Sequence, residues 1–405
     1  MNILFLSINV NSKNNRDNIT YSFIWKEMCQ LANKGHNVYY LSNLRNNIIK
    51  DGIYVISRSL ILEKNNIFRK FQNIIFAFKN LFFIFNLLKI EFKKTLYVCG
   101  TERACMKIIK KYKINIIHTH FFMPDGEAAV LSARKYRVPV VATLRGAELY
   151  DMPKIDYGAC RSEFYKTSLC NSIKYIDYIT CPNKYLVEKL MSEFNYSQEK
   201  IRYVPNGVEN MHTVKNKYHA DNEVLFISIC KLIKRKNLDI VLQTMIDLNQ
   251  KYKFKYIIVG SGPLKQKYEN ILNNYNVIHN ITIYDEMPKN KLYKLLSQCD
   301  CLINASLAEG MPNVVLESLA IGIPCLVSNI PGHNEVVQVG YNGFMFDPYS
   351  KHDLMNKMQH ILYDITILNN MKKNCINSAK YFAIESKIDK YISIYDALLK
   401  KDTKN

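Results

Sequence analysis

The chain alternates short runs of β-branched and aromatic residues with longer stretches of helical pattern. These runs begin, in the first half, at Asn2, Asn37, Asn115, Val138, Tyr175 and Ile201, and in the second half at Val224, Lys255, Asn280, Asp300 and Ile323. Strands that alternate with helices predict parallel sheets covered by helices. We therefore expect an α/β fold of two doubly wound domains that meet at a cleft, with the ligand at the carboxyl ends of the strands.

The length of 405 residues also favours two domains, since it exceeds what one ordinary core supports. The polar stretch Asn206–Glu223 breaks the alternation and is the expected linker. We place the first domain at 1–208 and the second at 209–381, and the C-terminal helix at about 382–399 is free to pack back on the first domain. Another helix is expected to close on Gly35, because glycine supplies the left-handed residue that ends a helix.

The formal net charge of +20 favours anionic partners such as nucleotides, lipid headgroups or nucleic acid, although lysine can also simply be the surface residue of choice. The densest basic run, Lys231–Asn237, does not lie in a glycine-rich tail of the kind that binds nucleic acid. The eleven cysteines form no CxxC pair, and no signal peptide precedes them. We expect reduced thiols in a cytoplasmic protein and no metal site.

The most apolar segment, residues 67–94, is interrupted by charges too often to span a bilayer. This pattern is compatible with two structures: a pair of core helices, or an interfacial helix whose basic residues face anionic lipid. The second interpretation places the protein peripherally on the inner face of the plasma membrane.

The stretch from Asp300 to Pro324 contains the residues that we expect to bind the ligand. A strand, the loop SLAEGM and a helix follow one another, with Pro312 in the first turn and Gly322 at the end. Free N–H groups at Asn313–Val315 favour a phosphate. Glu317 inside the helix and Glu309 in the loop are suited to accept hydrogen bonds from ribose and sugar hydroxyls. Alternatively, Glu309 is a solvated loop residue and Glu317 pairs with a lysine.

Glu309 and Glu317 form an E-x7-E motif, and the run EGMPNVVLESLAIGIPCLVSNIPGHNEVV with NGFMFDP resembles the retaining GT-B glycosyltransferases of family 4. VGSGP at Val259, PNGVE at Pro205, IIHTHFFMPDGEAA and VPVVATLRGAELY also resemble that family. The resemblance, which covers roughly residues 2–348, implies two Rossmann-like domains facing across a cleft.

The resemblance also implies roles for matched positions. Lys231 and Lys236 would neutralise the donor's diphosphate, Glu317 would hold the ribose, and Glu309 would hold the sugar. The remaining donor-binding positions would be Gly260, Gly310, Met311, Pro312, Asn313 and Val314. His120 would lie near the reacting centre, so that His120, Glu309 and Lys236 form the implied catalytic set.

The chain departs from the family pattern at several positions. Cys230-Lys231 stands where the family usually has Gly-Arg, which keeps the charge but loses the bidentate guanidinium. The first loop has no glycine pair. Arg145 stands where the family often has histidine, and it could clamp an acceptor phosphate or form a salt bridge with Glu148.

We therefore expect a retaining hexosyltransferase that moves a sugar from a nucleotide-diphosphate-sugar to a lipid-linked or glycan acceptor, in surface polysaccharide or glycoconjugate biosynthesis. No DxD motif is present, so no metal or other cofactor is expected. The alternatives are a nucleotide-sugar epimerase of the same fold and a basic nucleic-acid-binding protein. The second lacks any recognisable nucleic-acid-binding signature, so we expect no nucleic-acid partner.

Overall fold

The fold is taken from a computed structural model, which describes residues 1–7, 22–44, 46–61, 75, 92–122, 124–211 and 223–402. The chain divides into two compact units. The first consists of Met1–Pro153, Tyr157–Val204 and Lys387–Asn405, and the second of Lys154–Asp156 and Pro205–Ser386.

The first unit is built on an eight-stranded sheet in the order β3-β4-β2-β1-β5-β6-β7-β8. Its strands are β1 Asn2–Leu6, β2 Asn37–Ser42, β3 Ile48–Lys50, β4 Ile53–Ser57, β5 Ile116–His120, β6 Val140–Thr143, β7 Tyr178–Cys181 and β8 Ile201–Tyr203. All neighbouring strands pair in parallel except β3 and β4, which form an antiparallel hairpin. Asp51 and Gly52 both take positive φ angles in its turn, and this pair of residues is a known hairpin signal.

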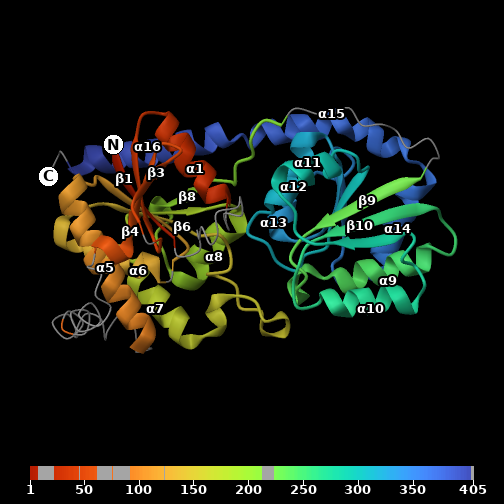
Figure 1. Cartoon of the computed structure of the whole chain (residues 1–405), viewed down its shortest axis with the longest axis horizontal. Coiled ribbons are helices and arrows are strands. Elements are labelled where there is room, and N and C mark those ends of the chain that lie inside the picture. The colour runs from red at the N-terminus through yellow and green to blue at the C-terminus, as the bar shows by residue number, and fades with distance from the viewer. Residues whose placement is uncertain are drawn as a thin grey trace. The chain divides into compact units, whose positions relative to one another are not determined.

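Helices connect these strands. They are α1 Ser22–Asn33, α2 Arg58–Ile61, α5 Phe92–Tyr112, α6 Asp125–Tyr136, α7 Glu163–Ile173, α8 Lys184–Phe194 and α16 Ile384–Asp402, with short 3-10 turns at Pro153–Ile155, Ala159–Arg161 and Gln198–Lys200. From Lys387 onward, α16 belongs to this unit. In Figure 1, α1 and α16 lie on the side of the sheet opposite α5 and α6.

The second unit has a six-stranded, all-parallel sheet in the order β11-β10-β9-β12-β13-β14. Its strands are β9 Val224–Ile229, β10 Phe254–Val259, β11 Ile281–Tyr284, β12 Cys301–Asn304, β13 Cys325–Ser328 and β14 Gly343–Phe346. Its helices are α9 Leu238–Leu248, α10 Lys265–Asn274, α11 Lys289–Leu296, α12 Asn313–Ile321, α13 Pro331–Asn334, α14 Lys351–Tyr363 and α15 Thr366–Tyr381, with a 3-10 turn, η4, at Lys234–Lys236. α9 packs on α14 and α12 packs on α15, and Figure 1 shows α9 and α10 on one side of the sheet and α11 and α12 on the other. β12 and β13 are wholly buried, as expected for strands covered on both faces.

The expectation of two parallel α/β domains is confirmed, and each expected run contains a strand. The division, however, falls between Val204 and Pro205 rather than after residue 208. Its physical reason is local. The side chain of Asn206 is buried against Met311 and Asn313, and Val208 forms a bridge with Ala383, so the start of the expected linker packs on the second unit.

Each sheet reverses its strand order at one point. In the first sheet the reversal lies between β1 and β5, and in the second it lies between β9 and β12. In open α/β sheets, ligands bind outside the carboxyl ends of the strands at such a reversal. His120 is the last residue of β5, and Glu309 lies in the loop that follows β12, so each of these two predicted catalytic residues lies at the reversal point of its sheet.

Candidate functional site

In the second unit, Glu309 lies at the centre of a group of ion pairs. Its Oε1 accepts hydrogen bonds from Lys236 Nζ and, at 2.8 Å, from Ser306 Oγ. Its Oε2 pairs with the guanidinium of Arg235 at 2.9 Å. Both cations come from the 3-10 turn η4, which is the next element after β9. The alternative of a solvated loop glutamate is therefore wrong, because Glu309 is buried.

The two cations keep Glu309 ionised in spite of its burial. Burial alone would raise the pKa of this carboxyl group, but Lys236 and Arg235 hold the pKa of Glu309 below its ordinary value. A buried carboxylate is tolerated when it is paired in this way. The site therefore holds one negative and two positive charges, a net positive charge suited to an anionic ligand.

Backbone contacts fix the loop that carries Glu309. Arg235 donates to the carbonyl oxygen of Ala308 at 2.6 Å, and the N–H of Leu307 donates to the carbonyl oxygen of Arg235 at 2.8 Å. From the other side, Gly332 packs so closely that a Cβ on it would lie 2.7 Å from the Glu309 carbonyl oxygen. The loop is held against both the turn η4 and the start of α13, so its position is set before any ligand arrives.

The end of the loop is fixed by Asn206. Its side-chain amide donates to the carbonyl oxygen of Met311 and to Asn313 Oδ1, both at 3.0 Å. Asn206 belongs to the PNGVE motif. In the structure, this motif therefore orients the residues just before α12.

The helix α12 begins at Asn313, with Pro312 at its N-cap position. The N–H of Val315 donates to the carbonyl oxygen of Pro312 at 3.2 Å, so the expected donor at Val315 is already used. Within the part of the chain that the structure describes, no acceptor is recorded for the N–H groups of Asn313 and Val314. These two N–H groups and the helix dipole remain to favour a phosphate.

Glu317, one turn into α12, is half-buried and already has two partners. Lys289 Nζ lies 3.1 Å and Tyr293 Oη 2.8 Å from its Oε1. The alternative prediction that Glu317 pairs with a lysine is thus confirmed by the contact with Lys289. Because both contacts use Oε1, and no donor to Oε2 is recorded among the described residues, Oε2 remains available to a ligand hydroxyl.

The other predicted donor residues take different positions. Lys231 is exposed in the segment after β9 and makes no recorded ion pair among the described residues. Gly260 follows β10, where an added Cβ would lie 1.8 Å from the carbonyl oxygen of Cys230. Close backbone packing therefore explains this glycine without a ligand. Gly310 and Met311 lie in the loop that Asn206 fixes.

In the first unit, His120 is fully buried at the end of β5. Its ring stacks on Phe5 and on His118, with centroids 5.4 and 4.5 Å apart. Burial, followed by the neighbouring His118 and the cations Arg145 and Lys387, lowers the pKa of His120. The imidazole is therefore neutral near pH 7.

Arg145 forms an ion pair with Glu27. Its guanidinium Nη2 lies 2.9 Å from Glu27 Oε1 in α1, and its backbone N–H donates to the Glu148 carboxylate at 3.1 Å. Lys387, from α16, lies 2.5 Å from the same oxygen of Glu27. Arg145 and Lys387 therefore share Oε1 of Glu27.

Sequence reasoning missed several of these residues, among them the charged residues Arg235, Glu27 and Lys387. Arg235 was visible as the residue beside Lys236 in a dense basic run. Glu27 was visible as the one acidic residue in the first expected helix. Lys387 carried no local signal, because only the return of α16 to the first unit brings it to Glu27.

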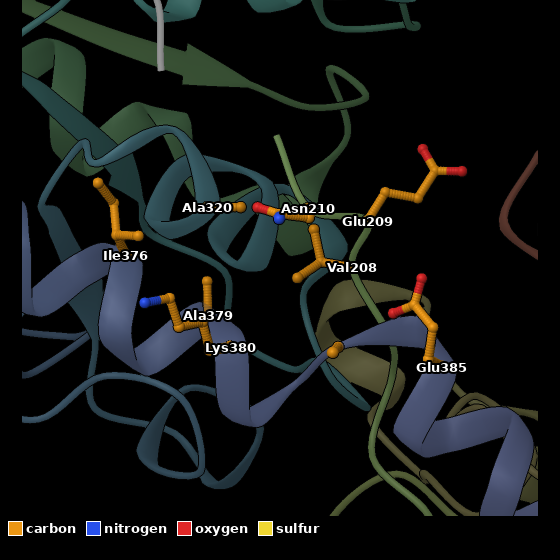
Figure 2. Close-up of a pocket in the computed structure, with 9 residues that line it drawn as sticks. Val208, Glu209, Asn210, Ala320, Ile376, Ala379, Lys380 and Glu385 are labelled. Carbon is orange, nitrogen blue, oxygen red and sulfur yellow. The ribbon is translucent and has the colours of Figure 1, made fainter. Parts of the chain in front are cut away.

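A cavity of about 260 Å³ opens in the second unit, away from the Glu309 group (Figure 2). Its wall combines apolar side chains with three charged ones: Val208, Ala320, Ile376, Glu209, Lys380 and Glu385. None of the predicted donor-binding residues lines it.

Three further expectations concern features of the whole chain. None of the eleven cysteines, all of them in the described ranges, forms a disulfide. Among the described residues no group of three or more potential ligand side chains could hold a metal ion, and no helix there has the length and apolarity to cross a bilayer. The segment 67–94 lies, apart from residue 75 and the start of α5, outside the described residues.

Two protein-family models match the chain, one over most of the first unit and the other over most of the second. Residues 26–210 match the family model described as Glycosyltransferase Family 4, and residues 210–380 match the one described as Glycosyl transferases group 1. The chain is similar to the UDP-Gal:alpha-D-GlcNAc-diphosphoundecaprenol alpha-1,3-galactosyltransferase of Escherichia coli, with 28% identity over 71% of this chain and 77% of that protein. It is also similar to the alpha-monoglucosyldiacylglycerol synthase of Streptococcus pneumoniae, with 25% identity over 65% of this chain and 62% of that protein.

Among solved structures, the sucrose-phosphate synthase of Thermosynechococcus elongatus matches with a TM-score of 0.75 and 16% identity, over 99% of both chains. At this identity the likeness shows the fold, which is GT-B.

Proposed function

We propose that this chain, which belongs to the group 1 glycosyltransferases of family 4, moves a sugar from a nucleotide-diphosphate-sugar to a lipid-linked or glycan acceptor. The observation that carries the proposal is the buried Glu309 with its two cations, set beside the free N–H groups at the start of α12. A nucleoside diphosphate joined to a polar sugar supplies the anion and the hydroxyl groups that such a site can bind.

In this proposal the donor's diphosphate binds Lys236, Lys231 and the N–H groups of Asn313 and Val314. Glu317 accepts a hydrogen bond from a ribose hydroxyl through Oε2, and Glu309 accepts from hydroxyls of the sugar. Preorganised cations and amides stabilise the charge that develops as a diphosphate leaves. We assign this role to the protein's own groups, so that the reaction proceeds without a metal ion.

The reaction we propose retains the anomeric configuration. The bond between the anomeric carbon and the diphosphate oxygen breaks, and the acceptor hydroxyl oxygen forms its bond on the same face. The departing diphosphate takes the acceptor's proton. From the first unit we assign His120 to the reaction, as the family resemblance implies.

Two relatives support the choice of acceptor. The names of the Escherichia coli and Streptococcus pneumoniae proteins give a diphosphoundecaprenol-linked sugar and a glycosylated diacylglycerol, both of them lipids. We propose a lipid-linked acceptor of this general kind, in surface polysaccharide or glycoconjugate synthesis on the cytoplasmic face of the membrane. The net charge of +20 is consistent with an anionic lipid surface.

The test begins with a thermal-shift screen of nucleotide-sugars. A donor at a hundred times its Kd should stabilise the domain by about 2.7 kcal/mol. The donor found in this way is then incubated with the enzyme alone and with lipid-linked acceptors, and products are identified by mass spectrometry. Transfer that requires the acceptor supports the proposal. Conversion of the donor without acceptor would identify an epimerase instead.

A further inference from the structure

The inference concerns Arg145 and rests on the proposed role of His120 in transfer. Nη2 of Arg145 lies 2.9 Å from Nδ1 of His120, as well as 2.9 and 3.0 Å from the two carboxylate oxygens of Glu27. One guanidinium nitrogen therefore bridges the imidazole and the carboxylate. All three side chains are buried.

The direction of the contact to His120 follows from chemistry. A guanidinium has only donors and stays protonated in proteins. Nδ1 of His120 must therefore be the acceptor, and it cannot carry a proton while the contact exists. A neutral imidazole with an unprotonated Nδ1 has its proton on Nε2.

The remaining nitrogen is unused. Nε2 of His120 is buried and has no hydrogen-bond partner among the described residues. Oε2 of Glu27, the carboxylate oxygen recorded beside Nε2 among these residues, lies 3.6 Å away, which is beyond hydrogen-bond distance. The site thus holds an N–H group whose partner remains to be supplied.

We infer that Arg145 is a positioning residue that fixes His120 as the neutral tautomer with its proton on Nε2, so that His120 donates a hydrogen bond to a substrate oxygen and does not act as a base. Nε2 has no lone pair to take a proton, and the lone pair of Nδ1 is held by Arg145. The proton of the attacking hydroxyl group on the acceptor substrate must then go to a group other than His120, which agrees with its proposed transfer to the departing diphosphate.

The surroundings hold Arg145 in this position. Glu27, from α1, binds it from one side, and the ring of Phe23 lies under its guanidinium, 4.7 Å from centroid to Cζ. Lys387, from α16, shares Glu27 with it. In the described part of the chain, the charged or titratable groups recorded around His120 are Glu27, Arg145 and Lys387, together with His118 on its own strand, and the lowered pKa of His120 is consistent with the arrangement.

The direct test is the protonation state of His120 in solution. In protein labelled with 15N-histidine, long-range 1H–15N correlation spectra distinguish the two tautomers and the doubly protonated ring. Comparison with a His120→Gln variant assigns its signals among those of the nine histidines. We expect wild-type His120 to stay neutral, with the proton on Nε2, from pH 6 to pH 8. A proton on Nδ1, or a doubly protonated ring in this range, would overturn the inference.

Two matched variants separate positioning from simple loss of charge. Arg145→Met removes the donor to Nδ1 and leaves Glu27 paired with Lys387, whereas Lys387→Met removes a cation of the same group and leaves that donor in place. In Arg145→Met we expect His120 to populate forms that carry a proton on Nδ1, because no donor then occupies that nitrogen, and kcat to fall at least about tenfold, since loss of a residue that fixes an imidazole tautomer can cost up to ~10⁴. In Lys387→Met the wild-type tautomer should persist. Unchanged His120 spectra and unchanged kcat in folded Arg145→Met would contradict the inference.

Arg145→Lys keeps a cationic donor and should restore the neutral Nε2–H tautomer. If Arg145→Met fails to fold, the spectra of the wild type and of Arg145→Lys decide the question. These spectra need no substrate. Absence of transfer with the expected spectra would count against the proposed function alone, and transfer by a wild type whose His120 titrates near pH 6.5 would count against this inference alone.

Discussion

Replacement of Lys236 by methionine tests whether the positive charge of Lys236 stabilises the diphosphate of the donor. The change removes one cation but leaves Glu309 bound to Arg235 at 2.9 Å and to Ser306 at 2.8 Å. The buried carboxylate is therefore still compensated, and the cost of about 3–5 kcal/mol expected for an unpaired buried charge is avoided. What is lost is one charge-assisted hydrogen bond, worth about 1.5–3 kcal/mol.

These magnitudes give two separate expectations for Lys236→Met. At roughly 2–4 °C per kcal/mol for a domain of this size, Tm falls by about 3–12 °C and the fold survives. Loss of a preorganised group that stabilises developing charge lowers kcat/KM by about 10²–10³. Activity is therefore affected far more than folding.

The assay is acceptor-dependent transfer by the purified variant, with thermal melts followed by circular dichroism. Lys265→Met is the matched control, since Lys265 belongs to the same unit and makes an ion pair with Asp285 at 2.6 Å outside the Glu309 group. It should leave transfer unchanged and shift Tm less than Lys236→Met does, because Lys265 is a surface residue. A folded Lys236→Met enzyme with wild-type kcat/KM would refute the reasoning.

Four further outcomes are expected. Glu317→Gln should raise the KM for the donor by roughly 10- to 100-fold, because a hydrogen bond to a charged acceptor becomes one to a neutral acceptor; an unchanged KM in donor titrations would exclude contact with the ribose. Glu27→Gln leaves Arg145 and Lys387 without their carboxylate and should destabilise the fold by about 3–5 kcal/mol, and a thermal melt with wild-type Tm would disprove this pairing. Burial, followed by Arg145, lowers the pKa of Lys387 to about 7. Between about pH 7 and 10, Lys387 keeps its proton in the unfolded chain but has lost it in the folded chain. The free energy of unfolding of the wild type should therefore rise with pH relative to that of Lys387→Met, by up to ~1.4 kcal/mol per pH unit. A pH-independent difference between the melts of the two proteins would argue against a depressed pKa of Lys387. EDTA should leave the transfer rate unchanged, and inhibition that a divalent cation reverses would show that a metal is required.

Most strands could be located along the chain from the sequence, because buried parallel strands appear there as short apolar runs. The hairpin of β3 and β4 escaped notice, although its Asp51-Gly52 turn was a readable signal. β14, in the motif NGFMFDP, was also missed as a strand, since a glycine opens it. The end of α12 at Gly322, with φ 90°, was predictable because few other residues adopt that conformation readily.

The two glutamates of the candidate site could be predicted from the sequence, but the cations that pair with the buried carboxylates could not. Glu309 and Glu317 follow from their spacing and from the helix between Pro312 and Gly322. The partners do not, because Arg235 reaches Glu309 across 74 positions of the numbered chain and Lys387 reaches Glu27 only after the chain has returned to the first unit. Local patterns locate a buried carboxylate, but tertiary structure decides which cation compensates it.

The most direct measurement is the position of a nucleoside diphosphate in a co-crystal structure. We predict that its phosphates contact Lys236 and the first N–H groups of α12, with the ribose at Glu317. A nucleotide bound instead in the cavity beside Val208 and Ala320, with Lys236 still held only by Glu309, would contradict the account.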